Sequence, residues 1–204
     1  MYKNMLMTVV ALVSVGSLAS AQEKRLFTPY GESVMVGAGA TDFTDQATRN
    51  TTSAGGYWDV RASFGTRSYV GVEGAYLGAA TPIHSLGMDS NALLARNGVE
   101  GNMRLNLPIL IKSEFLIEPF VVGGVGWAHY SLTNTTTNTS SVQDNNDVLT
   151  LPIGTGIAFG YSGFLIDARF VFRAAYADTM LKTMAGDPAG LGNWQLGATA
   201  GYEF

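Results

Sequence analysis

The sequence predicts an all-β fold, an eight-stranded antiparallel up-and-down transmembrane β-barrel. Three observations indicate it. Apolar and polar residues alternate with period two in eight segments. The connections between these segments are long and short in turn. Charged residues make up only 14% of the chain, against about 25% in an average soluble domain, although apolar residues are spread along its whole length.

The N-terminal residues 1–21 have the pattern of a cleaved signal peptide. Lys3 gives a positive start, an apolar stretch covers residues 5–16, and Ala19-Ser20-Ala21 forms a small-residue cleavage site. The apolar stretch is shorter than the ~20 residues that a spanning helix needs. We therefore expect secretion to the periplasm, with residues 22–204 forming one barrel domain.

Four segments alternate so clearly that all their charged residues share one face while bulky apolar residues occupy the other. A helical stripe would scatter these charges over several faces. The segments are residues 58–64, 99–107, 166–174 and 194–204.

Four further segments alternate with weaker contrast. They are residues 33–41, 69–77, 120–130 and 149–159. In residues 120–130 we expect Val121, Val125 and Trp127 to point outward. The eight segments have roughly the 9–11 residues with which a tilted strand crosses a bilayer.

The connections between the predicted strands differ in length. Residues 42–57, 78–97, 131–148 and 177–193 are long and polar. Residues 65–68 and 160–163 are short, and residues 108–119 form a longer exception. Long loops at one end and short turns at the other are typical of outer-membrane barrels. An even number of strands leaves both termini on the short-turn side, the periplasm.

With these features, and with Gly201-Tyr202-Glu203-Phe204 at its end, the sequence resembles the small Gram-negative outer-membrane barrels related to the OmpA membrane domain. Residues 100–106 and 167–170 also resemble strands of such proteins. The resemblance implies that Tyr202 and Phe204 belong to a signal for the barrel-assembly machinery. The chain carries no counterpart of the peptidoglycan-binding domain of OmpA, so we do not expect that activity.

The charged residues on the polar strand faces predict the content of the barrel. A charge that faces acyl chains at mid-depth costs roughly 2–4 kcal/mol, so this face must be the lumen. An eight-stranded barrel is just wide enough for side chains to fill it, and the charges nearly balance. We therefore predict an ion-pair plug in which Arg104, Arg169 and Arg173 pair with acids of neighbouring strands. The predicted network is Asp59, Arg61, Glu73, Glu100, Arg104, Asp167, Arg169, Arg173 and Glu203.

The tryptophans give the barrel an orientation. Trp58, Trp127 and Trp194 all fall at the long-loop ends of their strands. Amphipathic aromatic rings favour the membrane–water interface. We expect these three residues at the outer interface, with phenylalanines at the turn end.

Other motifs give no sign of catalysis or of a cofactor. His84 and His129 are the only histidines, too few for a metal site with defined spacing. No serine lies in a G-x-S-x-G turn and there is no cysteine, so we expect neither an enzyme nor a disulfide. We interpret Gly37-x-Gly39 and Gly154-x-Gly156 as small lumen residues beside bulky arginines. The net charge of −4 argues against nucleic acid as a partner.

The sequence is compatible with three functions. The first is a structural or surface-interaction protein that acts through its long loops, with the lumen plugged by charges. The second is a narrow porin-like channel for small solutes. The third, least favoured, is a soluble periplasmic lipocalin-like carrier with its apolar faces turned inward. The expected partners are outer-membrane lipid, the barrel-assembly machinery and an unidentified ligand of the loops, and we expect a monomer.

Overall fold

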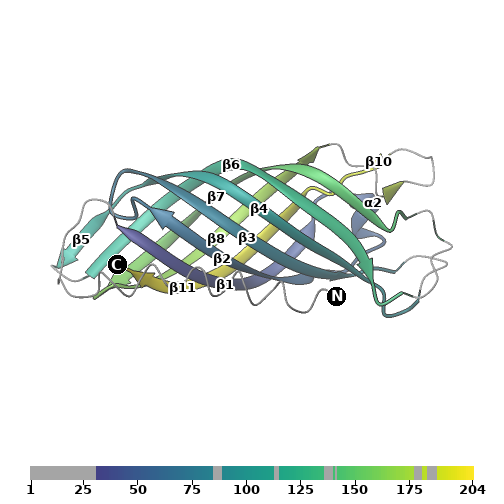
Figure 1. Cartoon of the computed structure of the whole chain (residues 1–204), viewed down its shortest axis with the longest axis horizontal. Helices are drawn as coiled ribbons and strands as arrows, with labels where there is room; N and C mark the ends of the chain where they lie inside the picture. The colour runs from purple at the N-terminus through teal and green to yellow at the C-terminus, as the bar shows by residue number, and fades with distance from the viewer. Residues whose placement is uncertain are drawn as a thin grey trace, which may run out of the picture.

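Eight strands form the wall of a barrel (Figure 1). The computed structural model describes residues 31–84, 89–112, 115–135, 140, 142–176, 181–182 and 188–204. The predicted signal peptide lies outside them. The wall strands are β1 (Glu32–Phe43), β2 (Gly55–Phe64), β3 (Val70–Pro82), β4 (Leu93–Asn106), β6 (Phe115–Thr133), β7 (Asn145–Tyr161), β8 (Phe164–Tyr176) and β11 (Asn193–Glu203).

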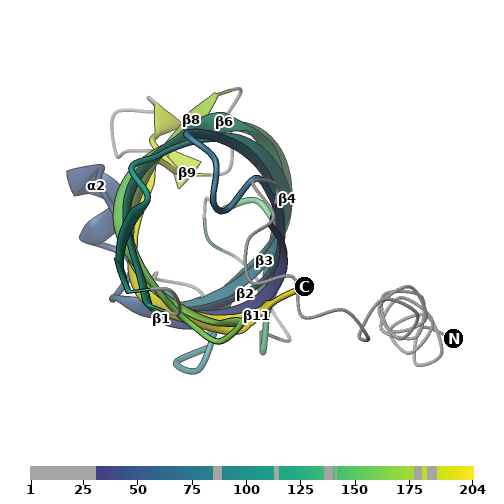
Figure 2. The ribbon, with the colours of Figure 1, turned by 90° about the vertical axis from the view of Figure 1, so that its left-hand side faces the viewer.

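Antiparallel pairing runs all the way around the wall and closes it (Figure 2). The first and last strands pair with each other, Ser33 opposite Glu203, so both ends of the barrel domain lie at one rim. The registers are staggered, because following them once around from Glu32 returns to β1 at Asp42. The residues on the way are Phe64, Val72, Met103, Gly123, Ile153, Phe172 and Trp194. Stagger of this kind tilts the strands of a barrel against its axis. The predicted eight-stranded up-and-down barrel is confirmed.

Several strands extend beyond their predicted ends. β6 and β7 have 19 and 17 residues and include parts of the connections predicted at 108–119 and 131–148. The 108–119 prediction is wrong in another way. β5 (Ile109–Lys112) follows β4 and pairs with the start of β6, Ile109 opposite Ile117. Pro108 lacks an amide N–H and interrupts the strand, but Leu107 N still donates to Pro119 O at 2.9 Å and holds the two sides together.

The two ends of the barrel differ, as expected. The end that carries the long connections, called the loop end, includes α2 (Gln46–Arg49), which Asp45 caps by accepting from the amides of Ala47 and Thr48. It also carries a small hairpin of β9 (Leu181–Lys182) and β10 (Pro188–Ala189). The opposite end, called the turn end, holds the C-terminus (Figure 1).

The turn between β7 and β8 is tight. Ser162 and Gly163 both have positive φ angles, 49° and 87°, which fits the two-residue hairpin turns that match strand twist. Among the described residues no helix is long and apolar enough to cross a membrane.

The wall has an apolar outer face and a polar inner face. On β6, for example, Val121, Val125 and Trp127 point outward and are 49%, 59% and 46% exposed. The outer face of β7 carries Leu149, Ile153 and Phe159. A contiguous exposed apolar surface on this scale is unusual for a soluble monomer. The charged strand residues, in contrast, are almost all buried inside.

Candidate functional site

Glu73 is the centre of an ion-pair network in the lumen. Arg61 Nη1 lies 3.2 Å from Glu73 Oε1, and Arg169 Nη1 lies 3.0 Å from the same oxygen. Arg61 also pairs with Asp59, and Arg169 Nε donates to Asp167 Oδ1 at 2.9 Å. Glu73 is on β3 and Arg169 on β8, which are not neighbours in the wall. The Glu73–Arg169 contact therefore crosses the lumen, and the prediction that Arg169 pairs with acids of neighbouring strands is wrong for this ion pair.

Arg104 extends this network toward the turn end. Its Nη2 lies 2.7 Å from Glu118 Oε1, and its Nε donates to Asn106 Oδ1 at 2.6 Å. The guanidinium lies 3.7 Å from the ring centroid of Phe120, a buried residue, which is a cation–π geometry. Gly156 makes room for this ring, because a Cβ there would lie 2.5 Å from Phe120 Cζ.

A second group of ion pairs lies nearer the loop end. Arg173 Nη2 donates to Glu100 Oε2 at 3.0 Å, and its Nη1 donates to Gln195 Oε1 at 2.7 Å. Arg96 Nη2 donates to Glu100 Oε1 at 3.3 Å. All four side chains are buried.

An apolar cluster, here called the cap, fills the lumen at the loop end. It joins inward residues of several strands with residues of the loops, and each is at most 8% exposed. Because its members come from the wall and from the connections, the cap covers the ionic network from the loop side. The cap consists of Phe43, Ile83, Ala92, Leu94, Ala128, Tyr130, Val142, Val148 and Leu191.

Eight of the nine predicted lumen charges lie in these two groups. The ninth, Glu203, instead lies at the turn end, where Arg67 of the β2–β3 turn binds its carboxylate through Nε and Nη2 at 2.8 Å. Thr66 Oγ1 also donates to it at 2.9 Å.

Sequence reasoning missed several members of the network. Arg96 and Glu118 fell within the predicted connections 78–97 and 108–119. Each is an even number of residues from an inward-facing residue, Arg96 from Glu100 and Glu118 from Phe120, and so lies on the same strand face. Extending the alternation outward would have found both. Gln195 and Asn106 were assigned to the correct face but not to a role, because they carry no charge.

Aromatic residues surround both ends of the outer face. At the loop end Trp58 lies 5.5 Å from Tyr76, and Trp194 stacks on Phe170 at 6.3 Å between ring centroids. Trp127, also at the loop end, stacks on His129. At the turn end Tyr202 lies between Phe164 and Phe204 in edge-to-face contacts at 5.4 and 5.3 Å. Phe64 and Phe159 are exposed near the same end.

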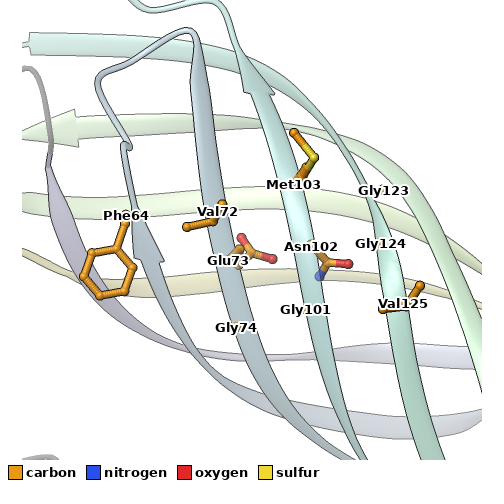
Figure 3. Close-up of a pocket in the computed structure, with 10 residues that line it drawn as sticks. All are labelled: Phe64, Val72, Glu73, Gly74, Gly101, Asn102, Met103, Gly123, Gly124 and Val125. Carbon is orange, nitrogen blue, oxygen red and sulfur yellow. The ribbon is translucent and has the colours of Figure 1, made fainter.

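A shallow groove of about 540 Å³ interrupts the outer face between β3, β4 and β6 (Figure 3). Outward-facing glycines form its floor, and Phe64 and Met103 flank it. A Cβ at Gly74 or Gly101 would meet no atom within 4 Å, so no contact within the described residues requires glycine there.

The remaining candidate residues are dispersed. His84 Nε2 lies 3.3 Å from Ser53 Oγ, and His129 Nδ1 lies 2.9 Å from Asp147 Oδ1. Within the described residues no group of histidine and acidic side chains could hold a metal ion. Gly37 faces the lumen, where a Cβ would lie 2.6 Å from Asp59 Oδ1. The side chains nearest to that point are those of Thr199 and Asp59, and Asp59 in turn pairs with Arg61.

The comparison with solved structures decides the fold class. Neisserial surface protein A (NspA) matches with a TM-score of 0.54 at 9% identity, covering 87% of this chain and 98% of that one. The chain has the fold of the small eight-stranded outer-membrane barrels. The N-terminal barrel domain of Pseudomonas aeruginosa OprF matches with a TM-score of 0.48 at 16% identity, over 85% of this chain and 99% of that one. Ail of Yersinia pestis matches with a TM-score of 0.41 at 19% identity, over 86% and 97%.

Sequence comparisons add nothing to the fold match. No protein-family model matches the chain, and no curated protein sequence matches it. The outer-membrane-barrel fold therefore stands on the structure.

Proposed function

We propose that this outer-membrane-type barrel spans the outer membrane and has a structural or surface-interaction role, exercised through the connections at its loop end. The observation that carries the proposal is the polarity of the wall. Its outer face is apolar between two groups of aromatic residues, and its ion pairs lie inside. A bilayer imposes this arrangement on a barrel, since hydrocarbon tolerates neither charges nor open strand edges.

The aromatic residues and the connections support one orientation. Trp58, Trp127 and Trp194 would lie at the outer interface, because outer-membrane barrels carry their longer loops on the extracellular side. The loop end would then face the exterior and the termini the periplasm. The likeness in fold to NspA, itself a surface protein, agrees with this orientation.

The lumen argues against the two other functions. A carrier of the lipocalin kind would enclose apolar side chains and expose charges, the reverse of what the barrel has. A pore needs a water path, whereas the central ion pairs and the cap lie one above the other in the lumen. We therefore favour a closed barrel over a channel.

Proteolysis of intact cells tests the location and the orientation together. We expect an external protease to cleave the loop-end connections and to leave the strands and the short turns protected. The fragments identify the cut sites. Cleavage only after the outer membrane has been permeabilised would overturn the orientation, and a protein that fractionates with the soluble periplasm would overturn the membrane location.

Conductance separates the closed barrel from the channel. In planar bilayers we expect the unmodified protein to show no large, steady channel, because buried ion pairs and the apolar cap fill the lumen. Opening the cap, for example with Leu94→Ser, should raise leakage of small ions. A stable open conductance in the unmodified protein would move the proposal to a pore.

Closure of the wall predicts heat-modifiable migration. Every wall strand is paired on both sides, so the refolded barrel has no edge from which to fray. We expect unboiled protein to resist SDS and to migrate apart from the boiled form on a gel. Identical migration of both samples after refolding in detergent would count against a closed barrel.

Deletion of Phe204 should impair assembly more than stability. Phe204 lies at the chain end, is 49% exposed and contacts Tyr202, so its loss removes little packing. We expect reduced amounts in the outer membrane but a nearly unchanged unfolding midpoint for the refolded variant. Phe164→Leu is the control, because it removes an aromatic contact of Tyr202 without altering the C-terminus. Normal outer-membrane levels of the deletion variant would contradict a role as assembly signal.

A further inference from the structure

The ion pairs nearest the cap contain more positive than negative charge. Arg96 and Arg173 are both buried, and both contact the same oxygen, Oε1 of Glu100. Arg173 also binds Glu100 Oε2 and the amide oxygen of Gln195. One carboxylate thus serves two guanidiniums, and of the two Arg96 has the longer and weaker contact.

The ion pairs nearer the turn end have the opposite imbalance, so the excess positive charge is a local property of the ion pairs nearest the cap. Nearer the turn end, four acids face three arginines, and each acid contacts an arginine of that group. These residues are Asp59, Glu73, Glu118 and Asp167 with Arg61, Arg104 and Arg169. The excess positive charge is therefore concentrated at Arg96, on the side of the cap.

Several of the buried hydrogen-bonding groups without a partner among the described residues belong to side chains around Glu100 and Arg173. Arg96 is 4% exposed, yet its Nε and Nη1 have no hydrogen-bond partner among the described residues. The same holds for Gln195 Nε2 and for Thr150 Oγ1. Thr150 Oγ1 and Glu100 Cγ lie 2.7 and 2.6 Å from the point that a Cβ on Gly126 would occupy, so the hydroxyl is beside Glu100. Three of these four groups are N–H donors and the fourth can donate.

The surroundings make a guanidinium with only half a counter-charge costly. Arg96 lies opposite Tyr130 in the β4–β6 register, and Tyr130 belongs to the cap. Arginine does not lose its proton in proteins, and an uncompensated buried charge is strongly destabilising. Donors without acceptors and a cation that shares its only carboxylate with a second arginine are both satisfied by one kind of ligand, a small anion.

We propose that the lumen binds one small inorganic anion between the cap and Glu100, held by Arg96 with Gln195 Nε2 and Thr150 Oγ1 as further donors. The chemistry fits a monovalent ion such as chloride, because the excess in this group is one positive charge. The anion would be enclosed during folding, since the cap covers the site.

Thermal unfolding of the refolded full chain in detergent micelles tests the site. The protein is refolded at each concentration of chloride, with a bulky organic anion keeping the ionic strength constant, so that entry through the closed cap is not needed. Above the dissociation constant we expect the midpoint to rise by about 3–5 °C for each tenfold increase in chloride. Crystals grown in bromide should show an anomalous peak beside Arg96.

Two variants remove the charge imbalance in opposite ways. Arg96→Met takes away the excess cation, and Gln195→Glu supplies the missing anion while it can still accept from Arg173. Both should lose the chloride dependence, and neither should lower the midpoint in chloride-free buffer. Arg67→Met is the control, because Arg67 binds Glu203 at the turn end. It should keep the chloride dependence of the unmodified protein.

The outcomes are distinct. A midpoint of the unmodified protein that does not respond to chloride, together with no bromide peak at Arg96, overturns the proposal in favour of water at these donors. Chloride dependence that persists in both variants overturns it as well, because the ion then binds elsewhere. If Arg96→Met fails to refold, Gln195→Glu and the bromide peak decide.

Discussion

Arg169→Ala should lower the free energy of unfolding by about 3–5 kcal/mol, the range observed when one partner of a buried ion pair is removed. Arg169 binds Asp167 and, across the lumen, Glu73. The substitution leaves Asp167 without its closest cation in a position that is fully buried. Water that enters the lumen would reduce the loss. Urea unfolding of the refolded barrel in detergent micelles measures it.

Arg49→Ala is the matched control, since it removes the same side chain from the first loop. Arg49 is 51% exposed and its Nε lies 3.5 Å from Asp42, so we expect little change, as for most exposed ion pairs. The double variant Arg169→Met with Asp167→Asn should recover part of the loss, because it removes both charges. If Arg169→Ala were as stable as the unmodified protein, the central ion pairs could not be what holds the lumen closed.

Substitution of Arg169 and substitution of Arg96 should have different effects on stability. Arg169 forms ion pairs with two buried acids, Glu73 and Asp167, so its loss leaves their negative charge without this cation. Arg96 shares its single acid with Arg173, so its loss relieves an excess of positive charge. Two arginines that are almost equally buried should therefore respond in opposite ways when no anion is present.

The fold could be predicted from the sequence because a barrel wall is a repeated local pattern. Each strand of the sheet reveals its two faces by alternation alone, as in residues 166–174, and the long and short connections fix their order. Strand ends were less predictable. Leu94 and Arg96 alternate like the rest of β4, but both lie within residues 78–97, which were assigned to a loop.

The site could be predicted only in part, for a related reason. Parity assigned Glu73 and Arg169 to the lumen, but which charges meet across it depends on the stagger of the barrel, a property of the closed wall. The cap depends on contacts between residues far apart in the sequence, such as Phe43 of β1 with Tyr130 of β6 at 6.5 Å between ring centroids. No local sequence pattern indicates such contacts, so the apolar cap at the loop end was not predicted.

Ile153→Arg should destabilise the barrel in a bilayer by about 2–4 kcal/mol, the cost of an arginine on the lipid-facing side at mid-depth. Ile153 lies in the middle of β7, points outward and is 64% exposed. In a soluble protein such an exposed position would tolerate the change to within about 0.5 kcal/mol. Folding equilibria in lipid vesicles, measured by tryptophan fluorescence against denaturant, distinguish the two environments.

The depth dependence of this cost gives the decisive control. Tyr161 lies at the turn end of the same strand and is 58% exposed, so Tyr161→Arg places the same charge near the interface. There the cost should fall to about 0–1 kcal/mol. A soluble barrel predicts small and equal effects at both positions, whereas a membrane-spanning barrel predicts a large difference between them. Equal small losses would therefore remove the apolar outer face as the support for a membrane location.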